Sequence, residues 1–228
     1  MDYALINNKI LETFIRGNIQ SFPFDCECII RELGFNVHKY SELSETKRTY
    51  CLMVSDESLK LLDNIYYNDN MAVQRIRFSL AHELGHIVLD HGDYLDPKKE
   101  AEANYFASCF LAPRMAIHYA RCKNQNDVAK IFNLSQEAAL YAFNDYRRWH
   151  RRTSIYKMNM LDKAMYQHFY NEEQKCFVYN IKKCAYCDSE IYNSSNITCK
   201  KCDKISYIRP VYDQDLMIAE SNWLYGGL

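Results

Sequence analysis

The sequence predicts an α+β fold that is mostly helical, and two observations carry this prediction. Long stretches between residues 72 and 152 place apolar residues at helical spacing, whereas short runs typical of strands fall before residue 68. Hydrophobic residues make up 48% of the 228 positions, and glycine (6) and proline (4) are scarce, so most of the chain can be ordered around a core. We therefore expect a small N-terminal sheet with helices beside it, and helices thereafter.

The N-terminal part is predicted to alternate helices with short strands. An apolar stripe predicts a helix over residues 8–19, and Asp25 is the predicted N-cap of a second helix that ends at Gly34. Strands are then predicted at 35–40, 51–54 and 64–67, with a turn over 56–62.

Helices are predicted to dominate from residue 72 onwards. The stretch 72–90 has one apolar face, and Asp96-Pro97 is typical of a helix start, because Asp caps well and Pro fits the first helical position. This second helix is expected to end at Pro113. Further helices are expected at 114–122, 127–132 and 136–149, the last two in a helix–turn–helix pattern, and residues 153–180 are expected to be helical in part.

The helix over 72–90 contains the pattern His82-Glu83-x-x-His86. Two histidines four residues apart lie on one face of a helix, where their imidazoles can share one metal ion. Glu83, next to the first histidine, can reach a metal-bound water and take its proton. The pattern therefore predicts the zinc site of a metallopeptidase.

The third ligand is expected from the helix that follows. A third histidine six residues after His86 is excluded, because position 92 is Gly. Glu100 and Asn104 are four residues apart and share a face, so Glu100 can bind zinc while Asn104 orients a ligand imidazole. Glu102 lies about 200° from Glu100 around the helix, so the two cannot both be ligands. Glu100 is favoured, with Glu102 as the alternative.

A hydrolytic mechanism follows from this ligand set. His82, His86 and Glu100 would hold zinc with an open fourth position for water, whose pKa the ion lowers to about 7. Glu83 would accept the proton, the hydroxide would attack a peptide carbonyl, and Glu83 would then protonate the leaving amine.

Two parts of this mechanism stay open in the sequence. A second donor to the oxyanion could be Tyr94, His91 or Tyr67, although His91 is expected on a different helical face, in contact with backbone. The strand near Tyr66 and Tyr67 could hold the substrate as an added β-strand.

The last four of the ten cysteines form a second candidate metal site. Cys184-x-x-Cys187 and Cys199-x-x-Cys202 are separated by 11 residues and can present four thiolates tetrahedrally, with no position left for water. This spacing predicts a structural zinc ribbon, and nearby lysines favour its thiolates. The ribbon could dock protein or nucleic acid, or act only as a stabilising appendage.

Composition limits the partners. The net charge of −1 favours neither nucleic acid nor membrane, no run of 18 apolar residues occurs, and the N-terminus lacks the apolar core of a signal peptide. We expect a cytoplasmic protein. Nucleic acid is a possible but not a favoured partner, because a charge run is more often a solvated face; the run here comprises Arg147, Arg148, Arg151 and Arg152.

The motifs together resemble the ImmA/IrrE family of metallopeptidases, specifically over residues 65–113 and loosely to about 150. The matching residues are Arg77-Phe78-Ser79-Leu80-Ala81-His82-Glu83-Leu84-Gly85-His86, Glu100-x-Glu102-Ala103-Asn104-x-Phe106-Ala107 and Leu111-Ala112-Pro113.

The resemblance implies a gluzincin-like zinc peptidase of bacteria, mobile elements or phages that cleaves a cognate helix–turn–helix transcriptional repressor. His82, His86 and Glu100 fall on the family's ligand positions, and Glu83 falls on its catalytic base. Ser79 replaces the commoner Thr. The Cys-rich tail occurs only in some members of the family. It bears on the choice of substrate and not on the chemistry of the zinc site.

The sequence thus predicts five parts, ending in a tail: a zinc metallopeptidase core (1–118), a helix–turn–helix-like segment (119–152), a helical linker (153–180), a four-cysteine zinc ribbon (181–210) and the tail (211–228). The predicted function is a zinc-dependent endopeptidase acting on a specific protein, with one catalytic and one structural Zn²⁺. The alternative is a non-catalytic, zinc-binding transcriptional regulator or a toxin–antitoxin component with the same fold.

Overall fold

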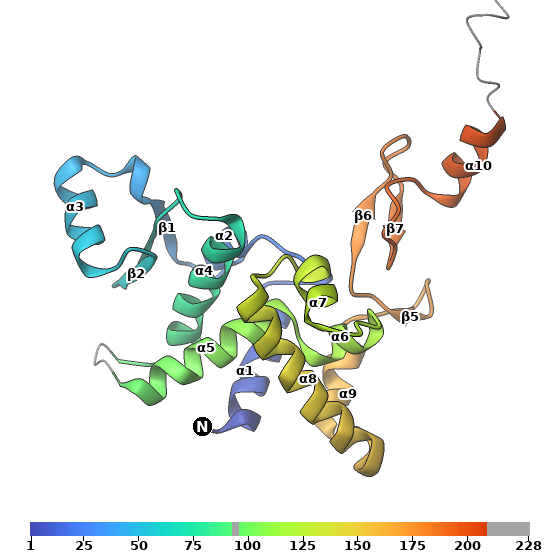
Figure 1. The fold of residues 1–228 in the computed structure, drawn as a ribbon, viewed down its shortest axis with the longest axis horizontal. Coiled ribbons are helices and arrows are strands. Elements are labelled where there is room, and N and C mark those ends of the chain that lie inside the picture. Colours follow the sequence, from blue (N-terminus) through green and yellow to red (C-terminus); the bar gives the residue numbers. More distant parts are fainter. Residues whose placement is uncertain (93–95, 209–228) are drawn as a thin grey trace, which may run out of the picture. The chain divides into compact units, whose positions relative to one another are not determined.

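The computed structural model describes residues 1–92 and 96–208, and it confirms a mostly helical α+β fold (Figure 1). The chain divides into two compact units, Met1–Asn180 and a second that begins at Ile181. The boundaries predicted at residues 118 and 152 lie inside the first unit and stay predictions, and the predicted tail (211–228) lies outside the described residues. Among the helices that the structure describes, none combines the length and the apolar character needed to cross a membrane.

Two helices capped by aspartate open the first unit. The side chain of Asp2 accepts hydrogen bonds from two backbone N–H groups at the start of α1 (Tyr3–Arg16), five residues before the predicted start. Asp25 caps α2 (Cys26–Glu32) in the same way, as predicted. Gly34 follows with φ of +96°, a conformation that glycine adopts without strain, and so ends the helix.

A three-stranded sheet follows, in the order β1-β3-β2. β1 (Asn36–Lys39) pairs in parallel with β3 (Asn64–Tyr67), which pairs antiparallel with β2 (Ser58–Leu61). β3 is therefore the central strand and β2 has one unpaired edge. A short 3₁₀ turn, Tyr40–Glu42, leads from β1 into the next helix.

Two predictions between β1 and β3 are wrong. Residues 51–54 are not a strand but the last turn of α3 (Glu45–Val54), and the stretch predicted as a turn contains β2. A four-residue apolar run is too short to show its period, and the polar residues before it belong to the same helix. Because only Cys51 of α3 is buried, the helix has almost no apolar stripe to indicate it.

The two helices predicted to carry the site lie side by side (Figure 1). They are α4 (Val73–Val88) and α5 (Pro97–Leu111), the latter capped by Asp96 with Pro97 in its first turn. Gly85 lies where the backbones of the two helices come close together. A Cβ there would lie 3.1 Å from Cδ1 of Phe106 and 3.3 Å from the Cα and carbonyl oxygen of Ala103. Gly85 therefore provides room for close packing of the two helices.

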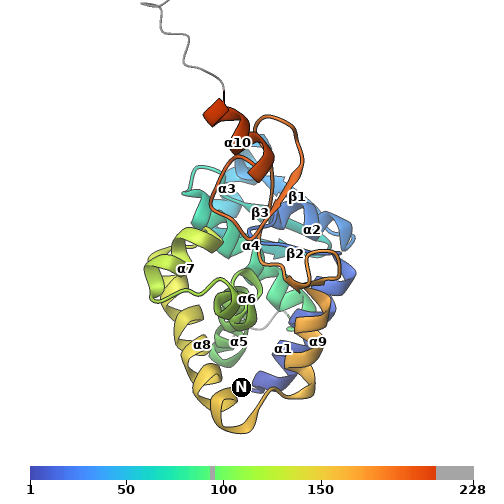
Figure 2. The ribbon, with the colours of Figure 1, turned by 90° about the vertical axis from the view of Figure 1, so that its right-hand side faces the viewer.

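Helices α6 to α9 complete the first unit. They are α6 (Arg114–Tyr119), α7 (Gln125–Phe132), α8 (Gln136–Tyr156) and α9 (Met160–His168). The turn between α7 and α8 contains Asn133 at φ of +53° and Ser135, whose hydroxyl caps α8 by accepting from the N–H of Ala138. Figure 2 shows α9 beside α1. The strands β4 (Tyr170–Asn171) and β5 (Cys176–Phe177) form a short hairpin after α9.

A buried arginine ties the helix–turn–helix-like segment to α4. Arg77, which is 8% exposed, donates from Nη1 to the carbonyl oxygens of Phe132 (3.1 Å) and Asn133 (3.4 Å) at the C-terminal end of α7. The negative end of a helix dipole favours a cation there. One hydrophobic cluster also joins residues of α1, α4, α5, α7 and α8. The segment therefore packs against the helices of the site.

The second unit is small. β6 (Ile181–Lys183) and β7 (Glu190–Tyr192) form an antiparallel hairpin, and α10 (Lys200–Ile208) follows.

We predict that Gly85→Ala destabilises the protein by about 1 kcal/mol. Overpacking against Ala103 costs about 1–3 kcal/mol, while the gain in helix propensity is about 1 kcal/mol. Denaturant unfolding measures the difference. Gly92→Ala is the matched control, because among the described residues a Cβ there meets only Nζ of Lys99, at 3.9 Å. A Gly85→Ala variant as stable as Gly92→Ala contradicts the role assigned to this contact.

Candidate active site

α4 presents His82 and His86 on one face, as the four-residue spacing predicts. Their Nε2 atoms lie 3.0 Å apart. Glu100, from the first turn of α5, faces both: its Oε2 lies 3.3 Å from Nε2 of His82 and its Oε1 3.3 Å from Nε2 of His86. The structure thus brings Glu100 to the two imidazoles, and not the alternative Glu102.

This cluster fits a zinc ion. Ligand atoms about 2.0–2.1 Å from a tetrahedral zinc lie about 3.3 Å from one another, which is close to the separations among His82, His86 and Glu100. Nδ1 of His82 lies 3.0 Å from Oδ1 of Asn104, so the predicted contact that orients this ring is present. Burial, helped by the nearby His82, lowers the pKa of His86 to about 4, so its ring is neutral and can bind metal at neutral pH.

Glu83 is held beside the cluster by a contact that the sequence did not predict. The Ser58 hydroxyl, on the edge strand β2, donates a hydrogen bond of 2.8 Å to Oε1 of Glu83. Glu83 is buried, and desolvation raises its pKa above the ordinary value even though Ser58 and His82 act in the opposite direction. A carboxylate with a raised pKa is a better proton acceptor, which is what a general base requires.

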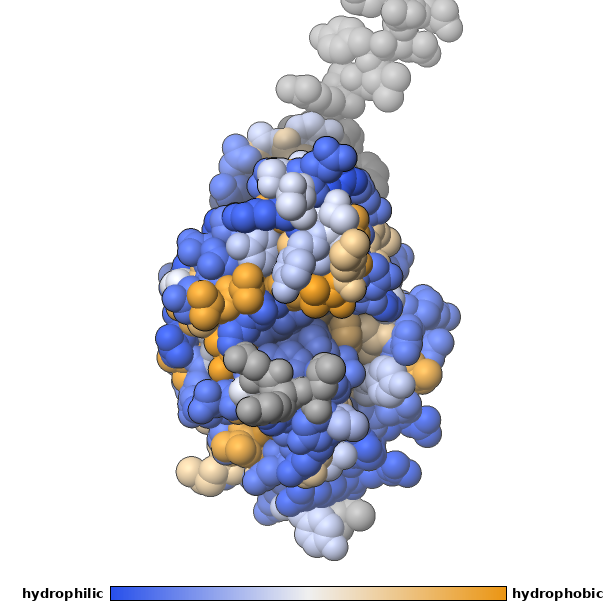
Figure 3. All heavy atoms as spheres, turned by 90° about the vertical axis from the view of Figure 1, so that its left-hand side faces the viewer, coloured by the Kyte–Doolittle hydropathy of each residue, from blue (hydrophilic) through white to orange (hydrophobic). Residues whose placement is uncertain are grey.

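The cluster opens onto a cleft of about 770 Å³, which a peptide segment can enter. Glu83, Glu100, His82 and Ser58 all line it. Figure 3 faces this side of the molecule and shows a hollow lined largely by hydrophilic residues. Beside Ser58, the Glu57 carboxylate accepts a hydrogen bond from the hydroxyl of Ser79 and pairs with Arg75. These contacts lower the pKa of Glu57, the pairing with Arg75 most strongly.

The open parts of the sequence-based mechanism need correction. Tyr67 and its neighbour Tyr66 lie on the central strand β3, which has no free edge for a substrate, and the Tyr67 hydroxyl is buried and donates to Glu27 (2.9 Å). The ring of His91 lies beside His86 and Glu102, and the backbone N–H of His91 bonds to the His86 carbonyl oxygen. Tyr94 lies outside the described residues.

Tyr3 and Tyr141, which the sequence did not indicate, line the cleft together with Tyr105. Neither they nor Ser58 belong to a motif, so only the fold could have identified them.

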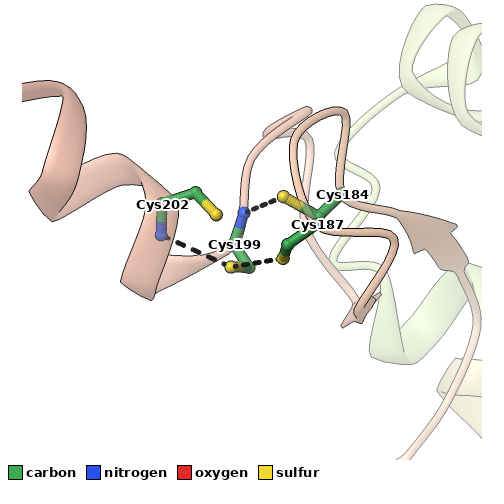
Figure 4. Close-up of side chains that lie close together, drawn as sticks. All are labelled: Cys184, Cys187, Cys199 and Cys202. Atoms are coloured by element: carbon green, nitrogen blue, oxygen red, sulfur yellow. Dashed lines mark hydrogen bonds between the residues drawn. The ribbon is translucent and has the colours of Figure 1, made fainter.

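The second unit gathers the four cysteines of the ribbon. The sulfur atoms of Cys184, Cys187, Cys199 and Cys202 lie within 4.8 Å of one another, with Cys187 and Cys199 at 3.6 Å (Figure 4). Sulfur ligands about 2.3 Å from a tetrahedral zinc lie about 3.8 Å apart, so the cluster fits this ion. The ten cysteines all lie in the described part of the chain and all are free thiols.

Backbone N–H groups prepare this cluster for a cation. The N–H of Cys199 points to the sulfur of Cys184 (3.3 Å) and that of Cys202 to the sulfur of Cys199 (3.5 Å). Such donors lower the pKa of Cys184, with Tyr186 as the largest contributor, and lower that of Cys199 to about 6. Cys202 instead donates to its neighbours, and its pKa rises to about 12. Metal ligation would require that proton to leave.

Comparisons with known proteins agree with the geometry. The family model described as Peptidase_M78, IrrE N-terminal-like domain, matches residues 30–144, which include α4, α5 and all three side chains of the His–Glu cluster. The search of curated proteins gives no match.

We predict two zinc ions per chain in protein purified without chelator. His82→Ala should leave one, because it removes an imidazole from the His–Glu cluster, and Cys184→Ser should leave the other. Elemental analysis of both variants measures the zinc content per chain. The control is His38→Ala, because His38 lies on β1, outside both clusters. If the wild-type chain holds a single zinc ion, one of the two sites is wrong. It is the site whose variant still holds that ion.

We also predict that Glu83→Gln stabilises the metal-free protein at neutral pH. Because burial raises the pKa of Glu83, ionising it in the folded state costs free energy, and Gln avoids that cost. The advantage should be full above the folded pKa and vanish as the pH falls below the unfolded value of about 4.3. Urea unfolding between pH 4 and pH 8 measures it.

Glu27→Gln provides a control of opposite sign. Burial opposes ionisation of Glu27, but hydrogen bonds from Arg31 and Tyr67 lower its pKa overall. This substitution should therefore destabilise the protein near neutral pH, with the loss disappearing as the pH falls. An equal effect of both substitutions would contradict the assignment of a raised pKa to Glu83.

Proposed function

Since the chain belongs to the Peptidase M78 family of IrrE N-terminal-like domains and so carries a zinc metallopeptidase-like domain, we propose that it is a zinc-dependent endopeptidase that cleaves a specific protein. One observation carries this proposal: three potential ligands meet at the wall of a cleft, and a buried carboxylate with a raised pKa lines the same wall. A site that only binds zinc has no need of such a carboxylate.

Each residue of the site has a role in this proposal. His82, His86 and Glu100 would hold the metal, which when bound acts as a Lewis acid toward water and the peptide carbonyl. Glu83 would accept the proton of the attacking water and return it to the leaving amine. Ser58 keeps Oε1 of Glu83 in place, so the other carboxylate oxygen remains available for the proton.

The edge strand β2 fits an extended substrate. No strand in the described part of the chain pairs with its outer edge, and Ser58 on β2 contacts Glu83, so a peptide added to β2 would pass the base. Leu61, Leu62 and Met53 are large apolar side chains that are more than half exposed at the end of β2 and in α3. Exposed apolar groups are typical of protein-binding surfaces. We propose a protein substrate on these grounds.

The resemblance to ImmA/IrrE peptidases suggests which protein this is. We propose a helix–turn–helix transcriptional repressor of a mobile element, phage or stress response, cleaved inside the cytoplasm. A second candidate function is a non-catalytic regulator or a toxin–antitoxin component with this fold. The basic residues Arg147, Arg151 and Arg152, all exposed or nearly so on α8, favour it because they can contact phosphate.

The two functions differ in what Glu83→Gln should do. Under the peptidase proposal this variant keeps two zinc ions but loses about 10²–10⁴-fold in kcat/KM, because the base is absent. The measurement is incubation with a full-length repressor encoded by a neighbouring gene, with fragments mapped by mass spectrometry. Glu27→Gln is the matched control and should cleave normally. A Glu83→Gln variant that keeps zinc and full biological activity would exclude the peptidase.

A further inference from the structure

A third histidine and a third carboxylate stand behind the proposed zinc site. The ring of His91, whose side chain is 6% exposed, lies between His86 and Glu102. Its Nδ1 is 3.0 Å from Nδ1 of His86, and its Nε2 is 3.4 Å from Oε2 of Glu102. The three side chains therefore form a continuous line that begins at the rear of a potential zinc ligand.

The donor in each of these contacts follows from the chemistry of imidazole. Nε2 of His86 faces Glu100 and His82, so a metal there would take its lone pair and leave the ring proton on Nδ1. His86 then donates to Nδ1 of His91, which must accept and so carries its own proton on Nε2. That second N–H faces the carboxylate of Glu102. The His86–His91 contact and the His91–Glu102 contact thus each have one donor and one acceptor. This arrangement keeps the proton of His86 on Nδ1, which is the tautomer that can bind a metal through Nε2.

The backbone places His91 for this contact. After the last residue of α4, Asp90 adopts φ of +53°, and the N–H of His91 bonds to the carbonyl oxygen of His86 at 2.9 Å. The chain thus turns back so that His91 lies beside His86. Glu102 reaches His91 because it points away from the face of α5 that carries Glu100. α5 therefore supports both ring nitrogens of His86. Glu100 faces Nε2, and Glu102 reaches Nδ1 through His91.

We propose that His91 and Glu102 are positioning residues that fix the tautomer and orientation of His86 for zinc. The proposal rests on the proposed zinc site, and it gives His86 the counterpart of the contact between Asn104 and His82. Hydrogen-bond partners behind a ligand histidine raise metal affinity by about 10–100-fold. Neither residue contacts the other two ligands or lines the cleft, so their effect should reach the site through His86.

The test is the zinc affinity of the full chain, measured by competition with a chromophoric chelator. The His82→Ala variant defines the signal of the four-cysteine site, which is then subtracted. His91→Phe keeps a ring of similar size without its nitrogens and should weaken binding at the His–Glu site by about 10–100-fold. His91→Asn, whose Oδ1 can replace Nδ1 as the acceptor, should recover most of that loss. Thermal unfolding of the metal-free variants reports on folding.

A double-mutant cycle separates the hydrogen-bonded line from simple packing. Glu102→Met should weaken zinc binding alone, but add little to His91→Phe, because the line is already broken. The matched control is His38→Phe, which removes another partly buried histidine hydrogen bond, at 3.0 Å to Asn64. It should leave zinc affinity unchanged.

The outcomes are distinct. If wild-type protein binds zinc only at the cysteines, the proposed function fails. If wild-type protein binds two zinc ions but His91→Phe binds zinc as tightly as the wild type, the positioning role is overturned. It is also overturned if the effects of His91→Phe and Glu102→Met on zinc affinity add in full. If His91→Phe does not fold, Glu102→Met decides alone: zinc affinity equal to that of the wild type overturns the positioning role.

Discussion

The close packing of α4 against α5 is the constraint on which the site depends. The two ligands of α4 and the carboxylate of α5 lie 3.0–3.3 Å apart, so a small change in the distance between helices would open the cluster. Gly85 sets that distance, because its missing side chain lets the backbone of Ala103 approach. Glu100 and Asn104 flank Ala103 in sequence, so the close contact and the ligand contacts lie within about one helical turn of one another.

The rest of the first unit holds this helix pair in place. Near its start, α4 is attached to the α7–α8 turn by Arg77, and further along it packs on α5. The guanidinium of Arg77 is buried, and removing its partners would leave a desolvated charge, so this attachment is costly to break. A segment with the pattern of a DNA-binding motif thus has a structural role in supporting α4, the helix that carries His82 and His86. That role accounts for its buried face without requiring a nucleic acid.

Sequence reasoning predicts those parts of the fold and site that depend on local rules. Asp25, Asp96 and Gly34 act as expected because capping and positive φ depend on a few neighbouring residues. The His82–His86 spacing and the shared face of Glu100 and Asn104 follow from helix geometry alone. The strand predicted at residues 51–54 is wrong because a short exposed helix has almost no periodic signal. Ser58, His91 and Glu102 carry no such signal, since each contact joins elements whose proximity only the tertiary fold determines.

In the proposed mechanism, the contact of Ser58 with Glu83 would link substrate binding to the proton acceptor. β2 is held by hydrogen bonds on one side only, so its free edge is less constrained than β3. A peptide that pairs with this edge would satisfy the unpaired backbone groups and restrict the strand. Because the Ser58 hydroxyl bonds to a buried carboxylate at 2.8 Å, restricting β2 also restricts Glu83. A bound substrate would thereby order the base against which it reacts, and a peptide too short to pair along β2 would forfeit that ordering as well as its own affinity.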